Sequence, residues 1–109
     1  MPQKESDSRD TLSESALEKE LVLAVKKAHG LILKLNPLWY IGIPDRLILL
    51  PKAKIFFVEL KRYGEKPRRN QVRWLTLLQR LGFPALTVAG KVELKTFIRE
   101  HINGFEDLP

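Results

Sequence analysis

The sequence contains no cysteine, which excludes disulfide bonds and thiolate metal sites from this chain of 109 residues. It has no apolar run close to the roughly 20 residues that a membrane-spanning helix needs. Residues 1–15 are polar and lack the hydrophobic core of a signal peptide. A glycine-rich phosphate loop and an HExxH motif are also absent. These absences predict a cytoplasmic protein, and the length of 109 residues predicts one domain.

The net charge of +6 is distributed unevenly along the chain. Residues 1–20 carry six acids and three bases, a net charge of −3, so the remainder carries +9. Between 61 and 73 a single acid, Glu65, accompanies six bases: Lys61, Arg62, Lys66, Arg68, Arg69 and Arg73. Such a cluster is typical of a surface that contacts phosphate backbones, and a merely solvated basic face has the same composition.

Hydrophobic periodicity predicts the element order α-β-β-β-α-β-α. Two capping boxes compete for the start of the first helix, Thr11 with Glu14 and Ser15 with Glu18, and Gly30 should end it. Strands are expected at 31–35, 46–50, 55–61 and 85–88, and further helices at 68–81 and 92–102. The inward stripe of the second helix should consist of Trp74, Leu77, Leu78 and Leu81. We therefore expect one α/β domain over 13–103, with a mixed central sheet flanked by helices, a flexible N-terminal tail (1–12) and a C-terminal tail (104–109).

Charged residues stand at the ends of the two most hydrophobic strands. Asp45 precedes the apolar run 47–50, and Glu59 and Lys61 follow the run 55–58. Side chains alternate along a strand, so Glu59 and Lys61 should project from the same face. In an antiparallel hairpin the start of one strand lies beside the end of the next, so Asp45 should lie next to Glu59.

Two adjacent carboxylates repel each other unless a cation lies between them, and Mg²⁺ or Mn²⁺ suits such oxygen ligands. A bound metal ion would activate water and polarise a phosphate, while Lys61 could position or deprotonate the water or offset charge on the phosphate. The pattern therefore predicts metal-assisted phosphodiester hydrolysis. The same spacing also permits a structural interpretation, in which Asp45 caps a loop and Glu59 and Lys61 are rim charges. However, Glu59 follows four consecutive apolar residues, where a hydrophobic side chain would be easier to bury.

The segments GIPDRLILL, IFFVELKR and NQVRWLTLLQRLGFPALTV resemble the VRR-NUC domain, the stand-alone virus-type replication-repair nuclease of the PD-(D/E)XK superfamily, within residues 14–100. The resemblance implies a restriction-endonuclease-like fold and a Mg²⁺-dependent deoxyribonuclease, with Mn²⁺ as a substitute, in a bacterial or phage-infected cell. It implies Asp45, Glu59 and the Leu60 carbonyl as metal ligands and Lys61 as the catalytic lysine. It also implies a catalytic glutamate that ligates the metal from the first helix, where Glu18 aligns best and Glu20 is the rival.

The resemblance further implies Gln71 as a site residue and Lys34 as a basic contact. With the basic cluster, the predicted DNA-binding residues are Lys34, Arg62, Lys66, Arg68, Arg69 and Arg73. The expected substrate is branched DNA, such as a Holliday junction or a flap in DNA repair, cut by a homodimer that the apolar loop 38–41 could join. Two alternatives stay open at this point: a catalytically silent nucleic-acid-binding module, and a sequence-specific restriction-type nuclease.

Overall fold

A computed structural model describes residues 10–36, 38 and 40–105. The helices and strands are α2 (Glu14–Lys27), β1 (Leu31–Lys34), β2 (Arg46–Leu50), β3 (Lys54–Lys61), α3 (Arg69–Arg80), β4 (Ala85–Ala89) and α4 (Gly90–Phe97). A π-helical turn, Ile98–Ile102, and a 3-10 helix, Asn103–Phe105, follow α4 directly. The predicted order α-β-β-β-α-β-α is confirmed, and no strand boundary differs from its prediction by more than one residue.

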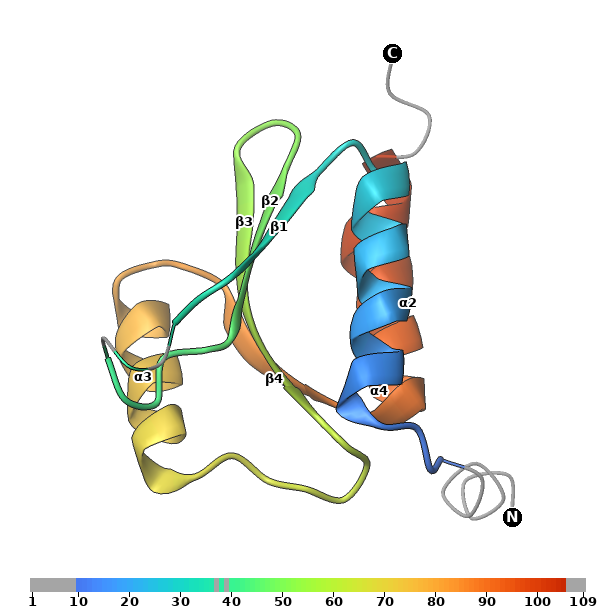
Figure 1. Ribbon diagram of the computed structural model, residues 1–109. Coiled ribbons are helices and arrows are strands. Elements are labelled where there is room, and N and C mark those ends of the chain that lie inside the picture. The colour runs from blue at the N-terminus through green and yellow to red at the C-terminus, as the bar shows by residue number, and fades with distance from the viewer. Residues whose placement is uncertain (1–9, 37, 39, 106–109) are drawn as a thin grey trace.

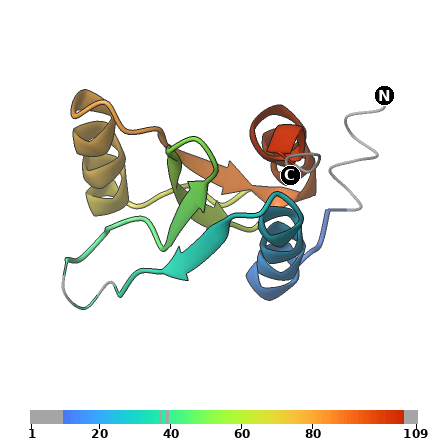
Figure 2. The same ribbon diagram turned by 90° about the horizontal axis from the view of Figure 1, so that it is seen from above.

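The four strands form one mixed sheet in the order β1-β2-β3-β4. β1 pairs antiparallel with β2, and β2 with β3, whereas β3 and β4 are parallel because α3 carries the chain across between them. α2 and α4 lie side by side on one face of the sheet and α3 lies on the other (Figures 1 and 2). The result is the predicted α/β domain with helices on both faces.

The larger core lies between the sheet and the pair α2 and α4. Alternate residues of β2 and β3 point into this core, among them Ile48, Val58 and Leu60, and meet Leu17 and Leu21 of α2. A smaller cluster on the opposite face joins Phe57 and Ala85 of the sheet to Leu75 and Leu78 of α3. Glu59 and Lys61 share the strand phase of Phe57, and the sheet therefore presents them on the face that carries α3.

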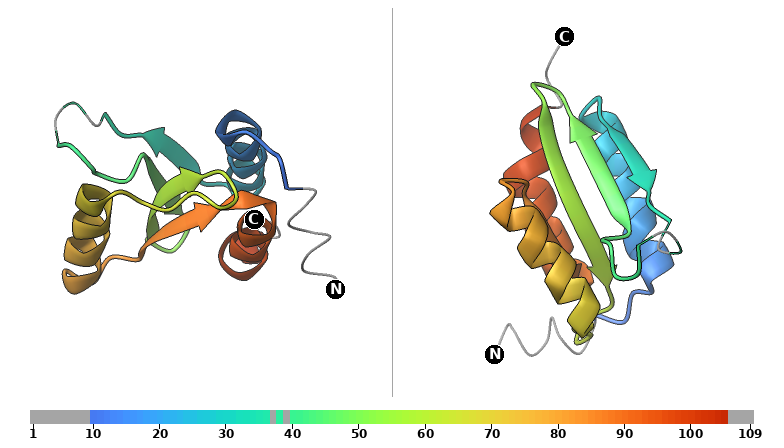
Figure 3. Two further views of the ribbon diagram at one scale, coloured as in Figure 1. Left: turned by 90° about the horizontal axis from the view of Figure 1, so that it is seen from below. Right: turned by 90° about the vertical axis from the view of Figure 1, so that its left-hand side faces the viewer.

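The predicted inward stripe of α3 is only partly correct. Leu78 is buried and Trp74 half-buried, but Leu77 and Leu81 are exposed, and Leu75 takes their place in the small cluster. α3 covers little of the sheet beyond β3 and β4 (Figure 3, right). The contact between α3 and the sheet is narrow and buries only two leucines of the helix, Leu75 and Leu78. The rest of the predicted apolar stripe therefore is not fully buried.

One part of the sheet on the α3 side is covered by none of the helices in the described residues. The strand registers align Leu31 with Leu49 and Ile55, and Leu33 with Leu47, in the phase of Phe57. None of these five leucine and isoleucine side chains packs in either core cluster, and Leu31 and Leu33 are exposed. Figure 3 (right) shows this open face of β1, β2 and β3 beside α3. We call Leu31, Leu33, Leu47, Leu49 and Ile55 the open sheet face.

The two ends of α2 differ from the predicted ends. Neither Thr11 nor Ser15 caps the helix: the Ser13 hydroxyl accepts a hydrogen bond from the Ala16 N–H at 3.1 Å. Helix α2 ends at Lys27, and His29, rather than Gly30, adopts the left-handed conformation, with φ of 63°. Gly30 has another role, since a Cβ at this position would lie 2.7 Å from the Leu49 carbonyl oxygen.

Residues 10–12, which fall within the predicted N-terminal tail, contact the domain. Asp10 is buried, and its Oδ2 accepts a hydrogen bond of 2.7 Å from the Lys91 N–H in the first turn of α4. Leu12 packs against the larger core, as does Phe105 beyond the predicted end of the domain. Residues 1–9 and 106–109 of the predicted tails lie outside the described residues. No helix in the described part of the chain has the length and apolarity to cross a membrane.

Candidate active site

The predicted meeting of Asp45 and Glu59 is confirmed by the sheet register. Arg46 pairs with Val58, so the next step along the hairpin places Asp45 opposite Glu59. The Leu60 N–H donates a hydrogen bond of 3.4 Å to Asp45 Oδ1, which ties this carboxylate to the backbone beside Glu59. Two strands that are strongly apolar thus bring two acids together at one end of the hairpin.

Burial sets the electrostatics of both carboxyl groups. Glu59 is only 5 % exposed, and its burial, followed by the negative charge of Asp45, raises its pKa to about 7 despite the nearby Lys61 cation. Burial also raises the pKa of Asp45, although the Arg46 guanidinium and the hydrogen bond from Leu60 oppose the change. Both groups are therefore costly to ionise without an additional cation.

Lys61 and Gln71 both approach the same oxygen of Glu59. Lys61 Nζ lies 3.9 Å from Glu59 Oε2, and Gln71 Nε2 donates a hydrogen bond of 3.2 Å to that oxygen. The other end of the Gln71 amide accepts the Arg68 N–H at 2.7 Å, which fixes the orientation of the amide. Gln71, which the sequence predicts to be a site residue, therefore connects the start of α3 to Glu59.

Glu18 reaches the site through a residue that the sequence analysis missed. Arg46 lies between the two acids, with Nη2 2.6 Å from Glu18 Oε2 and Nη1 3.4 Å from Asp45 Oδ2. Arg46 shares the strand phase of Ile48 and Leu50, which face α2 and the larger core. This strand phase could have identified Arg46 from the sequence, because an arginine on a buried strand face needs an acid on the facing helix.

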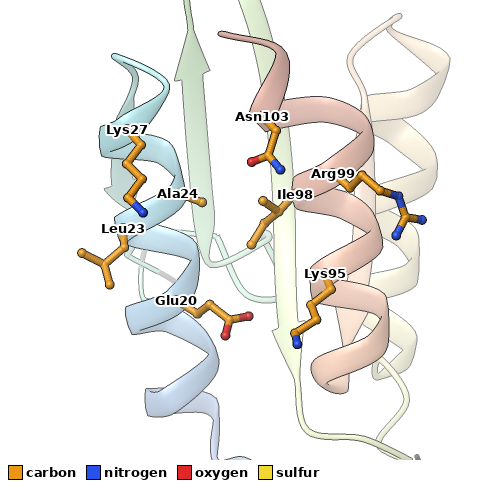
Figure 4. Close-up of a pocket in the computed structure, with 8 residues that line it drawn as sticks. All are labelled: Glu20, Leu23, Ala24, Lys27, Lys95, Ile98, Arg99 and Asn103. Carbon is orange, nitrogen blue, oxygen red and sulfur yellow. The ribbon is translucent and has the colours of Figure 1, made fainter. Parts of the chain in front are cut away.

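Glu20, the rival to Glu18, belongs to a different part of the surface. It lines a groove of about 520 Å³ between α2 and α4, together with Lys27, Lys95 and Arg99. Figure 4 shows the Glu20 carboxylate directed from α2 toward α4, on the side of Lys95. Of the two candidate acids, the structure therefore joins only Glu18 to the Asp45 region.

The chemistry of the donors fits a divalent cation at Asp45 and Glu59. Glu59 Oε1 is buried and has no hydrogen-bond partner among the described residues, so this oxygen is available to a ligand. Two carboxylates are enough for Mg²⁺, which keeps several waters when bound. No group of three or more acids and histidines in the described part of the chain is arranged to hold a metal, in keeping with Glu18 being held by Arg46.

A cleft of about 290 Å³ opens at the two acids, lined by Ile41, Gly42, Ile43, Asp45, Glu59, Arg68, Asn70 and Gln71. The Trp74 indole N–H donates a hydrogen bond of 3.0 Å to the Ile41 carbonyl, which fixes the loop before Asp45 against α3. Gly42 has φ of 93°, and a Cβ there would lie 2.8 Å from the Asn70 backbone, so only glycine permits this close contact. The loop and α3 together form the walls of the cleft.

Of the six predicted DNA-binding residues, only Arg68 lines the cleft. All six are exposed: Lys34, Arg62, Lys66, Arg68, Arg69 and Arg73. None of them forms a salt bridge with a described acid. Lys34 pairs with Arg46 across β1 and β2, and its strand phase is therefore that of the α2 face rather than that of Glu59. The other five bases lie on the loop after β3 and on α3, and the start of α3 lines the cleft.

Comparison with known proteins finds similar chains among curated proteins and among solved structures. A protein described as "Putative nuclease p44", from Acyrthosiphon pisum secondary endosymbiont phage 1, is 40% identical over 77 residues, which span 71% of this chain and 83% of that protein. A solved structure described as a VRR_NUC domain superposes with a TM-score of 0.75 at 27% identity, covering 81% of this chain and 96% of that chain. No model of a known protein family matches the sequence.

The fold and these matches define the class of the protein as a nuclease domain. More closely, the chain belongs to the VRR-NUC family of nucleases. The family and the fold that the sequence resemblance implied are therefore confirmed.

Proposed function

We propose that the protein is a divalent-metal-dependent DNA endonuclease that hydrolyses phosphodiester bonds, with selectivity for branched DNA. The observation that carries the proposal is the half-buried Asp45 carboxylate beside the buried Glu59, whose Oε1 has no partner in the described part of the chain. Asp45, Glu59 and the Leu60 carbonyl would hold Mg²⁺ or Mn²⁺. When bound, the cation supplies Lewis acidity toward the phosphate and offsets the charge of the two acids.

The side chains of the site have separate tasks in this hydrolysis. Water forms a new bond to phosphorus, the bond to the leaving sugar oxygen breaks, and the proton from water ends on solvent or the leaving oxygen. Lys61, whose Nζ lies 3.9 Å from Glu59 Oε2, would position that water or offset charge on the phosphate oxygens. Gln71 holds the Glu59 carboxylate in one orientation through its own fixed amide.

The basic cluster supports DNA as the substrate and backbone contact as the means of recognition. Arg62, Lys66, Arg68, Arg69 and Arg73 are exposed and carry no salt bridge to a described acid, so they are available to phosphates. Phosphate contacts position a nuclease but do not report sequence. Selectivity would then come from the shape of the DNA, as at a Holliday junction or a flap.

The apolar surface beside the cleft supports a homodimer, which would bring two active sites to one junction. Leu38, Tyr40 and Ile41 are exposed, at 85%, 59% and 75%, in the loop that the sequence analysis favoured as the contact. Trp39 of that loop lies outside the described residues. The open sheet face is a second apolar surface on the same side of the sheet as α3.

The test is cleavage of labelled duplex, flap and four-way junction DNA in Mg²⁺, Mn²⁺ or EDTA. We expect cutting of the junction or flap in either metal and none in EDTA. Asp45→Asn should abolish cutting while the exposed-surface control Glu100→Gln retains it, because only the first removes a ligand charge.

Cutting by Asp45→Asn at the wild-type rate would contradict the metal site. Metal-independent, salt-sensitive DNA binding without cutting would identify a silent binding module, and sequence-dependent cuts in plain duplex would identify a restriction-type enzyme.

A further inference from the structure

Arg46 is a buried cation in direct contact with one of the two site acids. Its side chain is 8% exposed. Nη2 lies 2.6 Å from Glu18, while Nη1 is 3.4 Å from Asp45 Oδ2 and donates a hydrogen bond of 3.1 Å to the Asp45 carbonyl. Nε is buried and has no partner among the described residues. The guanidinium is thus shared between two acids, with the closer contact to Glu18.

The sharing has a consequence for Asp45. A buried guanidinium without a neutralising acid is strongly disfavoured, and it prefers a bidentate pair with a carboxylate. Among the described acids, only Glu18 and Asp45 lie within salt-bridge distance of Arg46. If Glu18 loses its charge, Asp45 is the acid that remains for Arg46, and the unpartnered Nε gives the guanidinium a further donor with which to bind it.

We propose that Glu18 is a positioning residue that acts through Arg46: it holds the guanidinium on α2 and so leaves the Asp45 carboxylate free to bind the divalent cation. The inference rests on the proposed metal-dependent function of Asp45 and Glu59. It differs from a direct ligand role for Glu18, because Glu18 is then needed only while Arg46 is present. Removal of both residues should therefore be less harmful than removal of Glu18 alone.

The experiment is calorimetric titration of the metal-free protein with Mn²⁺, without DNA, so that binding is measured apart from catalysis. Glu18→Gln should weaken Mn²⁺ binding about 10-fold, since Arg46 then pairs with Asp45. Glu18→Gln with Arg46→Met should restore binding to within about 3-fold of wild type, a non-additivity that double-mutant cycles measure directly. Glu20→Gln, an acid on the same helix outside the site, is the matched control and should leave binding unchanged.

Two results would overturn the inference. Binding by the double variant as weak as that of Glu18→Gln alone would mean that Glu18 contacts the cation directly. Unchanged binding by Glu18→Gln would mean that Arg46 does not move onto Asp45. Folding is checked for each variant by circular dichroism, and Glu18→Gln with Arg46→Leu replaces the first double variant if methionine is not accommodated. Asp45→Asn separates the two proposals: wild-type Mn²⁺ binding by that variant would contradict the metal site itself, whatever the role of Glu18.

Discussion

Replacing Glu59 by glutamine should stabilise the metal-free protein near neutral pH while it abolishes cleavage. The side chain is 5% exposed, and its pKa is raised from the ordinary 4.5 to about 7, chiefly by burial and then by Asp45. An acid whose folded pKa lies above its unfolded pKa binds more protons in the folded state. The free energy of unfolding therefore falls as pH rises between 4.5 and 7, and the loss is complete only above pH 7.

The magnitude follows from the change in pKa. A move from 4.5 to about 7 corresponds to about 3 kcal/mol of lost stability above pH 7. Glutamine carries no charge and so avoids this loss, but it gives up the ion pair with Lys61 and must orient its own amide beside Gln71. A net gain of about 1–2 kcal/mol is expected, which for a domain of this size is a rise in melting temperature of about 5–10 °C.

The measurement is urea or thermal unfolding of both proteins in EDTA at pH 5 and pH 8. The variant should be clearly more stable than wild type at pH 8, and the difference should shrink at pH 5, where folded wild-type Glu59 is already protonated. Added Mg²⁺ should stabilise wild type and not the variant, because binding to the folded state alone raises stability. The control is Glu100→Gln, since Glu100 is an exposed acid whose one ion-pair partner among the described residues is Arg99. Equal or lower stability of Glu59→Gln at pH 8, together with a wild-type stability that does not change between pH 5 and 8, would refute the electrostatic reasoning.

Three further predictions concern other parts of the molecule. Asp10→Ala should lower the free energy of unfolding by about 1 kcal/mol in chemical denaturation, because it removes the side-chain cap at the start of α4; no change would mean that the N-terminal contact is unimportant for stability. Arg68→Ala with Arg69→Ala should weaken binding to all DNA sequences and reduce the log–log salt slope by about one for each phosphate that is no longer neutralised, whereas unchanged affinity at two salt concentrations would exclude this segment from the DNA path. Leu33→Asp on the open sheet face should convert a dimer to a monomer in sedimentation without unfolding the chain, since Leu33 packs in neither core; a dimer that persists would leave the loop 38–41 as the interface, to be tested with Trp39→Ser.

The strands and the meeting of the two acids could be predicted because they depend on local rules. Alternation fixes which residues of 55–61 share a face, and an antiparallel hairpin fixes which residue of one strand lies beside the end of the next. Asp45 and Glu59 are separated by only a short hairpin, so their proximity needs no knowledge of the rest of the fold. The place of Gln71 on Glu59 requires more, since α3 has to be set on the correct face of the sheet.

The errors arise where several local solutions are nearly equal. Three residues with hydroxyl groups, Thr11, Ser13 and Ser15, stand within five positions and could each cap α2. The structure uses Ser13, which has no glutamate three residues later, because the helix that starts there packs Leu17 into the larger core. Helix α3 has more apolar side chains than the sheet covers. The apolar stripe in its sequence therefore does not tell which of these side chains are buried. These choices are made by tertiary contacts, which a single sequence does not display.

Arg46 shows how the two faces of the sheet are linked at the site. It begins a strand whose alternate residues enter the α2 core, yet it follows directly after Asp45, which faces α3 and Glu59. Asp45 and Arg46 are adjacent in the chain, so the charges of the candidate site continue onto the core face of the sheet, where Glu18 pairs with Arg46. Ordinary core packing would place an aliphatic residue at Arg46, and such departures from local rules are expected at functional sites. The charges at the candidate site form one connected group: Asp45 is half-buried, Glu59 and Arg46 are buried, and Glu18 pairs with Arg46. In the proposed function, a divalent cation would compensate the charges of Asp45 and Glu59.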